Sequence, residues 1–305
     1  ASLLSPLAHD GAFDSSIFDI EKKNLIHELE SEVENHFYHA HLELNQLFYI
    51  SREMQIPRVS TVELMRQVTS ETSFSVFQKM LKEDQIDIFF IGDFNELAMQ
   101  EQFELFKFSD RKQILSLNYQ QNFSKILREG IEQKEAHQSI LEMGYHFPIQ
   151  YGEDSHIPLL VLNSLLGGYA HSKLFVEVRE KASLAYTVSS SMDIFSGMLR
   201  VYAGIDRQNR NKAMTLINRQ VTDLKRGNFS EEELQQTKKM LRNSALLSQD
   251  RQNSLLEMAY LSSILGEKFL AIDEWLIALE NVQKEDVVSA ANNLKLQAMY
   301  FMEGK

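Results

Sequence analysis

Cysteine is absent from this sequence of 305 residues. A chain without cysteine forms no disulfide, has no thiol nucleophile and cannot ligate zinc through sulfur. These exclusions remove the disulfide-stabilised small folds, the cysteine hydrolases and the cysteine-ligated zinc domains. Because the absence also fits a reducing compartment, we expect a cytoplasmic protein.

Long apolar runs and an excess of positive charge are absent as well. No apolar stretch is long enough to cross a bilayer, and the N-terminal ASLLSPLAHDGAF has no basic segment, so we expect neither a membrane span nor a secretory signal. The formal net charge of −12 repels a phosphate backbone, so we expect no nucleic-acid partner. Four prolines, 44% hydrophobic and 24% charged residues describe an ordinary soluble globular chain.

Several common catalytic motifs are missing. The 12 glycines are scattered and form neither a Walker loop nor a G-x-G-x-x-G fingerprint, and no G-x-S-x-G elbow occurs. The sequence therefore predicts neither a nucleotide site of these kinds nor a serine hydrolase. The aromatic residues follow helical and strand patterns, so we expect most of them in the core.

The first third of the chain is predicted to be mainly helical. Apolar residues recur near helical spacing after Ser15 and Ser16, which are candidate N-caps, and Ser60 with Glu63 forms a capping-box pattern. The run IDIFFI before Gly-Asp predicts a buried strand. The expected elements are helices over 15–38, 61–68, 71–81 and 96–106, a segment 39–49 that continues or restarts the first helix, and a strand over 86–91.

The second half combines strands and helices. Gly167 and Gly168 end an apolar helix, where glycine permits the positive φ of a C-terminal cap. Ser230 with Glu233 forms a second capping-box pattern, and the five residues 193–197 predict a hairpin connection. The expected strands are 136–147, 185–192, 198–205 and 298–302, and the expected helices are 156–166, 172–180, 209–225, 231–248, 255–265, 272–279 and 284–294.

The order of elements repeats along the chain. Two helices and the strand IDIFFIGD in the first third are echoed by two helices and the strand QAMYFMEG near the C-terminus. Two copies of one α+β domain explain this layout, the first copy lacking its opening strands and helices. We therefore expect the latter part of a first domain over 1–107, a linker over 108–134 and a whole second domain over 135–305.

The segment LLGGYAHSKLFVEVREKASLAYTVSS, residues 165–190, is the most informative in the chain. It places two glycines after an apolar run, then an amphipathic helix, with Arg179 and Tyr186 seven residues apart. Together with AGIDRQN and NFSEEELQQTKKML, it resembles the C-terminal domain of the M16 zinc peptidases, the pitrilysin and insulinase family. The resemblance covers nearly the whole chain and is densest over 144–242. It implies an α+β LuxS/MPP-like metallohydrolase fold, with mixed or antiparallel sheets flanked by helices in repeated domains.

The resemblance also implies that Arg179 and Tyr186 bind substrate, because in that family an Arg and a Tyr at this spacing hold the peptide backbone. A guanidinium offers a fixed fork of donors to carbonyl oxygens, and a tyrosine hydroxyl donates to a polarised carbonyl. The peptide would extend a sheet edge by one strand, as extended substrates do in the family. From the residues alone, the alternative is that Arg179 pairs with Glu177 or Glu180 and that Tyr186 packs on the sheet.

The zinc site of the family is missing from the sequence. Zinc-bearing members need H-x-x-E-H, in which two histidines hold the metal and the glutamate activates water, and none of the nine histidines belongs to such a motif. The run HELES starts like H-E-x-x-H but ends in serine, and His36, His39 and His41 have no glutamate placed to activate water. Glu28 falls at the third ligand position of zinc-bearing relatives, and we expect it to be a surface or interdomain carboxylate. We therefore expect no metal, no cofactor and no catalytic residue in this chain.

Three functional interpretations follow from the resemblance, which is nearest to bacterial members that lack the motif and are encoded beside a zinc-bearing partner. The first is a non-catalytic subunit that helps to position peptide for a zinc-bearing M16 subunit, as a heterodimer or by self-association. The second is the C-terminal part of a zinc metalloendopeptidase whose catalytic half is missing. The third is a structural M16 homologue without peptide binding. We favour the first, with the zinc on the partner.

Overall fold

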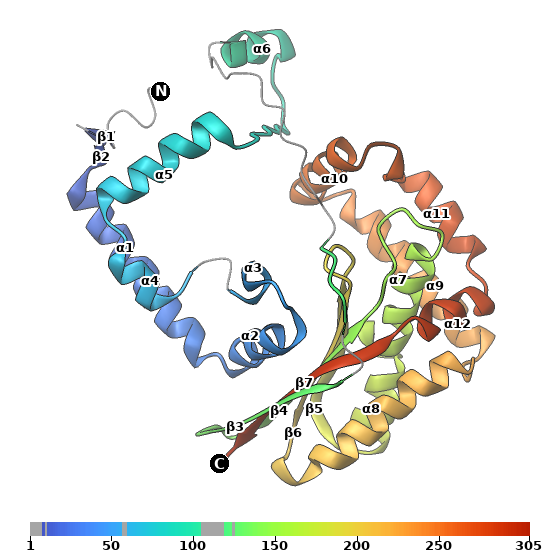
Figure 1. Cartoon of the computed structure of the whole chain (residues 1–305). Helices are drawn as coiled ribbons and strands as arrows, with labels where there is room; N and C mark the ends of the chain where they lie inside the picture. Colours follow the sequence, from blue (N-terminus) through green and yellow to red (C-terminus); the bar gives the residue numbers. More distant parts are fainter. Residues whose placement is uncertain (1–7, 10, 57–59, 105–118, 124–125) are drawn as a thin grey trace. The chain divides into compact units, whose positions relative to one another are not determined.

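A computed structural model describes residues 8–9, 11–56, 60–104, 119–123 and 126–305 (Figure 1). Its contacts divide the chain into two compact units. Unit 1 comprises Ala1–Asn35 and Pro57–Ser116, and unit 2 comprises His36–Ile56 and Leu117–Lys305. This division differs from the sequence-based one, because residues 36–56 join the second unit rather than the first.

Unit 1 consists of helices and two short paired strands. Its elements are β1 (Ala8–His9), β2 (Ala12–Phe13), α1 (Ser15–Glu34), α4 (Val62–Gln67), α5 (Ser70–Glu83) and α6 (Glu96–Glu104). Asp14 caps α1, because its side chain accepts hydrogen bonds from the amides of Ser16 (3.0 Å) and Ile17 (3.1 Å). The predicted serine caps lie inside the helix. Asn35, in an extended conformation, ends α1 four residues before the helix end expected near Tyr38.

Threonines cap the next two helices. Thr61 accepts a hydrogen bond from the amide of Leu64 at 3.3 Å, whereas the predicted cap Ser60 lies outside the helix with a φ of 99°. Helix α5 begins with a reciprocal capping box between Thr69 and Thr72. These side chains satisfy backbone amides that the first turn of a helix leaves without helical partners.

The run 86–91 forms no strand, so this prediction was wrong. Ile88 and Phe90 are 46% and 49% exposed, and within the described part of the chain no strand pairs with the run. A strand requires a neighbour for its backbone groups, and β-branched or aromatic composition alone does not supply one.

Unit 2 is organised around a five-stranded sheet in the order β3–β7–β4–β6–β5. The strands are β3 (Arg128–Lys134), β4 (Ser139–His146), β5 (Ala185–Asp193), β6 (Met198–Ile205) and β7 (Lys295–Gly304). Strand β3 is parallel to β7, and the other neighbours are antiparallel. The mixed sheet, flanked by helices, confirms the expected α+β class, and β5 with β6 forms the predicted hairpin.

Strand β3 occupies the last part of the predicted linker over 108–134. It lies at an edge of the sheet, and its alternate residues are exposed. That solvated face explains the polar sequence REGIEQK, which lacks the apolar pattern of a buried strand. The parts 108–118 and 124–125 of the predicted linker lie outside the described residues.

Helices pack on both faces of the sheet. The helices of unit 2 are α2 (His36–Phe48), α3 (Arg52–Gln55), α7 (His156–Asn163), α8 (Arg210–Lys225), α9 (Glu231–Ser248), α10 (Gln252–Leu265), α11 (Ile272–Asn281) and α12 (Lys284–Asn292), with π-helical turns η2 (Ser164–Gly168) and η3 (Leu174–Lys181) and 3-10 turns η4 (Arg207–Asn209) and η5 (Gly266–Lys268). Helix α9 has the predicted capping box of Ser230 and Glu233. Within the described residues, no helix is long and apolar enough to cross a membrane.

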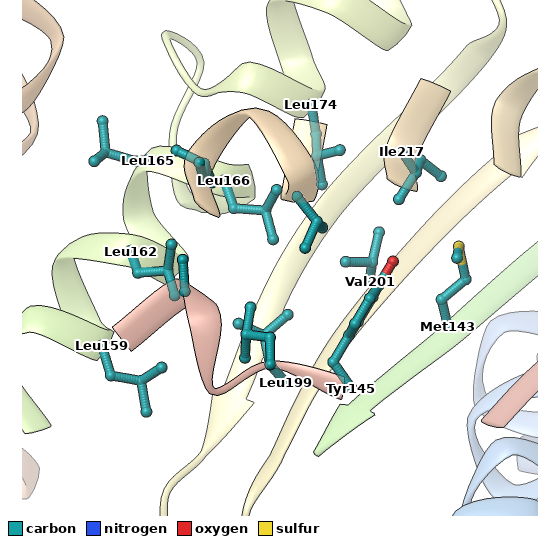
Figure 2. Close-up of a cluster of buried hydrophobic side chains, with 14 of the residues drawn as sticks. Met143, Tyr145, Leu159, Leu162, Leu165, Leu166, Leu174, Leu199, Val201 and Ile217 are labelled. Carbon is teal, nitrogen blue, oxygen red and sulfur yellow. The ribbon is translucent and has the colours of Figure 1, made fainter. Parts of the chain in front are cut away.

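The main core lies between the sheet and the C-terminal helices. In Figure 2, side chains of β4 and β6 meet side chains of α7, η2, η3 and α8. The labelled members include Met143, Tyr145, Leu159, Leu162, Leu165, Leu166, Leu174, Leu199, Val201 and Ile217.

Helix α2 covers part of the opposite face of the sheet. Its residues Ala40, Leu44 and Phe48, spaced one turn apart, pack against a second group of strand residues: Ile140, Met198, Ala298, Tyr300 and Met302. This packing is the reason that residues 36–56 belong with unit 2 although they precede most of unit 1's remaining helices in the sequence.

The glycine pair has a different role from the one expected. Gly167 has a φ of −155°, so the chain forms no left-handed cap there. A Cβ atom on Gly167 would lie 2.5 Å from the backbone nitrogen of Ser190 on β5. Ser189 Oγ also donates a hydrogen bond to the Gly167 carbonyl at 2.8 Å. Glycine is therefore required here by the close approach of η2 to the backbone of β5.

Candidate functional site

Arg179 lies in the last turn of η3 with an exposed side chain. Its guanidinium carbon lies 4.8 Å from the centroid of the Phe175 ring, a cation–π contact that holds the side chain in place. Glu177 pairs with Lys181 at 2.8 Å, and Arg179 forms an ion pair with none of the described residues. The N–H groups of Arg179 are thus available to a ligand. The alternative, in which Arg179 pairs with Glu177 or Glu180, is not what the structure shows.

Tyr186 stands at the beginning of β5 and is 60% exposed, so it does not pack on the sheet. Its hydroxyl donates a hydrogen bond to Asp206 Oδ1 at 2.9 Å. This bond and the negative charge of Asp206 raise the pKa of Tyr186. The pairing register of β5 with β6 shifts between Ala185 and Thr187, so Tyr186 projects from an irregular point of the strand.

The turn between η3 and β5 brings these two side chains to one place. Ser183, with a φ of 50°, reverses the chain, and the amide of Leu184 donates to the carbonyl of Val178 at 3.0 Å. Arg179 and Tyr186 then line one hollow of about 290 Å³, which we call the Arg–Tyr pocket. Its lining residues are Arg179, Ser183, Leu184, Ala185, Tyr186 and Asp206.

Asp206 is the member of this pocket that sequence reasoning missed. It follows β6 and occupies the N-cap position of η4, yet its side chain makes no capping hydrogen bond. It accepts a hydrogen bond from the Tyr186 hydroxyl instead. The phrase AGIDRQN contains this aspartate, but only the pairing of β5 with β6 places it beside a tyrosine twenty residues earlier.

The Arg–Tyr pocket combines a donor and an acceptor region. Arg179 offers N–H donors to carbonyl or carboxylate oxygens. Because Tyr186 donates its only proton to Asp206, its oxygen acts as an acceptor, and Asp206 adds a negative charge. The described residues of this pocket include no serine–histidine or cysteine–histidine pair of the kind that covalent catalysis uses. The arrangement suits binding of a polar backbone.

The histidine cluster of α2 does not converge on one point. His39 Nε2 lies 2.7 Å from Glu132 Oε2 and 3.3 Å from the hydroxyl of Tyr300. His41 instead lies beside Asn45, and burial together with Arg200 lowers its pKa to about 4. Within the described residues, no three histidine, aspartate or glutamate side chains are placed to hold a metal ion.

Helix α1 carries Glu28, which the resemblance placed at the third zinc-ligand position of zinc-bearing relatives. Glu28 is exposed on α1, as a surface carboxylate would be. The sequence contains no H-x-x-E-H motif, and the described residues bring no histidine pair to this carboxylate. The described residues around Glu28 therefore do not fit a zinc ion of this kind.

Comparison with known families gives the identity of the fold. The model of the Peptidase M16 inactive domain matches residues 67–241. The chain belongs to the M16 peptidase family. The family assignment predicted from residues 165–190 is thus confirmed, and the matched model is that of the inactive domain.

This M16 chain is similar to two proteins of Bacillus subtilis and to one solved structure. The "Probable inactive metalloprotease YmfF" of Bacillus subtilis is 30% identical over 303 residues, which are 99% of this chain and 71% of that protein. The "Uncharacterized zinc protease YmxG" of the same organism is 32% identical over 163 residues, which are 53% of this chain and 40% of that protein. A crystal structure of a conserved protein from Enterococcus faecalis V583 is 36% identical, with a TM-score of 0.94 over 98% of this chain and 71% of that one.

Proposed function

We propose that this chain is a non-catalytic M16 subunit that binds peptide and positions it for a zinc-bearing M16 partner. The observation that carries the proposal is the Arg–Tyr pocket, in which Arg179, without an ion pair among the described residues, and the exposed Tyr186 line one hollow at the start of β5. The lack of H-x-x-E-H in the sequence supports a role without metal chemistry of its own. The match to the inactive domain and to a relative named as an inactive metalloprotease supports the same role.

In this proposal, Arg179 donates hydrogen bonds to carbonyl oxygens of the bound peptide, and the oxygen of Tyr186 accepts one from a peptide amide. Strand β5 is an edge strand, so an extended peptide can lie beside its exposed beginning. A peptide fixed in this way loses its rotational freedom before cleavage, which lowers the barrier for the partner's reaction. Zinc on the partner would supply the activated water. The proposal includes a heterodimer in the cytoplasm, or self-association of this chain, as the assembly that encloses the peptide.

The test uses two samples: this chain alone, and this chain mixed with a zinc-bearing M16 protein of the same organism. Metal content and cleavage of a fluorogenic peptide library are measured in both samples. We expect no zinc and no cleavage for the chain alone, and faster cleavage in the mixture. The Arg179→Ala variant should reduce the stimulated rate about 10- to 100-fold, since it removes a charge-assisted hydrogen bond to the peptide.

Arg219→Ala provides the matched control for this loss. Arg219 is also exposed, lies on α8, and among the described residues pairs with Asp223 one turn further along. It should leave the stimulated rate unchanged. A mixture that cleaves no faster than the partner alone would favour a structural homologue, and zinc with activity in the chain alone would overturn the proposal. Restoration only by an added catalytic half of the same polypeptide would identify part of a peptidase instead.

A further inference from the structure

A second hollow lies on the face of the sheet that carries α2. Helix α2 packs on β7, β4 and β3, and leaves the same face of β6 and β5 partly uncovered. The space between the helix and these strands measures about 440 Å³, and we call it the aromatic pocket. Its lining residues are Phe37, Tyr38, His41, Thr187, Arg200 and Tyr202.

The wall of the aromatic pocket is mainly aromatic, and its one arginine already has a partner. Arg200 donates to both carboxylate oxygens of Glu142, from Nε at 2.6 Å and from Nη2. Burial and the nearby Arg200 lower the pKa of His41 to about 4, so this ring is neutral near pH 7. The rings of Phe37 and Tyr202 meet edge to face at 6.1 Å. An apolar or aromatic occupant fits such a surface, whereas a charged one would lose its hydration without gaining a partner.

The aromatic pocket opens next to the Arg–Tyr pocket. Tyr186 lines the Arg–Tyr pocket, and Thr187, the next residue of β5, lines the aromatic pocket. The pairing register of β5 shifts between Ala185 and Thr187, so strict alternation does not separate these two side chains, but adjacent strand residues are only about 3.3 Å apart along the chain. A short extended peptide that lies beside the beginning of β5 therefore reaches both pockets, its backbone at one and a side chain at the other.

We propose that the aromatic pocket binds one large apolar side chain, such as Phe, Tyr, Leu or Met, of the peptide held at the Arg–Tyr pocket. This inference rests on the proposed function and adds a substrate class to it. The volume lies within the range of about 300–1,000 Å³ that small ligands occupy, which suits a single side chain rather than a helix or a domain. Thr187 and Tyr202 form the strand side of this specificity site, and Phe37 forms the helix side.

The experiment measures binding of the full chain to a positional-scanning library of fluorescent dodecapeptides by anisotropy. The wild-type chain should prefer large apolar residues at one position, by about 10- to 100-fold over Ser or Asp, because burial of such a side chain supplies that much affinity. Thr187→Trp, which fills the pocket from the exposed strand edge, should remove this preference. Phe37→Ser should weaken it from the opposite wall.

Ser191→Trp is the matched control, because Ser191 is exposed on the same strand and on the same face but does not line the pocket. It should retain the preference, and circular dichroism should confirm that all variants are folded. Peptides that bind through Arg179 without any preference for large apolar residues would overturn this inference and leave the proposed function intact. A preference that survives in both Thr187→Trp and Phe37→Ser would overturn it too, and a library without any binder would overturn both proposals.

Discussion

Replacement of Arg200 by methionine is expected to destabilise unit 2 strongly. Arg200 holds Glu142, whose side chain is fully buried in the sheet, through two hydrogen bonds. Methionine is of comparable length but leaves that carboxylate without a partner. Removal of one member of a buried ion pair costs about 3–5 kcal/mol, because the remaining charge stays out of water. For a unit of this size, such a loss lowers Tm by roughly 6–20 °C.

The loss should depend on pH in a defined direction. Burial raises the pKa of Glu142 above its ordinary value, and Arg200 opposes the rise. Without Arg200 the folded-state pKa lies still further above the unfolded value, so the folded variant holds the proton more tightly. Its stability is then fully present below the unfolded pKa and is lost as the pH rises towards the folded one. Arg200→Met should therefore resemble the wild type more closely at pH 5 than at pH 8.

Urea unfolding at both pH values measures this effect. Trp275, the only tryptophan of the chain, packs against the core of unit 2, so its fluorescence reports the unfolding of that unit. Arg207→Met is the control, since Arg207 is 59% exposed and its pair with Glu303 should contribute less than about 1 kcal/mol. Arg200→Met combined with Glu142→Leu should recover most of the stability. A single variant as stable as the wild type at pH 8, or a loss equal at both pH values, would refute the reasoning.

Two further changes test the packing of unit 2 by thermal unfolding. Gly167→Ala should lower the free energy of unfolding by about 1–3 kcal/mol, because the added Cβ would lie 2.5 Å from the backbone nitrogen of Ser190. The control Gly168→Ala should be tolerated, because no neighbour lies closer than 3.6 Å to its Cβ. Equal stabilities of the two variants would contradict this account. Lys238→Met should lower the free energy of unfolding by about 1–3 kcal/mol. The buried ammonium donates hydrogen bonds to two carbonyls at the end of α11, one of them that of Val282 at 3.2 Å, and methionine leaves both without this donor. An unchanged Tm would show that these bonds contribute little.

Elements specified by local pattern were predicted well. The hairpin of β5 and β6 and the capping box at Ser230 depend on residues close together in the sequence, and both are present. The run 86–91 was wrongly predicted to be a strand and the edge strand β3 was missed, because strand formation depends on a neighbour elsewhere in the chain. Gly167 was misinterpreted for the same reason, since its neighbour Ser190 lies on another element.

The candidate site was partly predictable for a similar reason. Arg179 and Tyr186 stand in a short motif, so the resemblance located them from the sequence alone. Asp206 contacts Tyr186 only because β6 pairs with β5. The aromatic pocket joins Phe37 to Tyr202 across 165 positions, and no local pattern relates such residues.

The placement of α2 has a consequence for how this chain can be divided. The chain passes between the two units after residue 35, after residue 56 and again after residue 116. A protease that cuts between residues 104 and 119 therefore yields fragments that stay associated, because α2 remains on the sheet through Leu44 and Phe48. Unit 2 is built from two separate stretches of polypeptide. A chimaera of two relatives with a single junction therefore cannot exchange unit 2 alone. A fragment that starts at residue 117 would expose an apolar sheet face and is expected to aggregate unless residues 36–56 are supplied as a peptide.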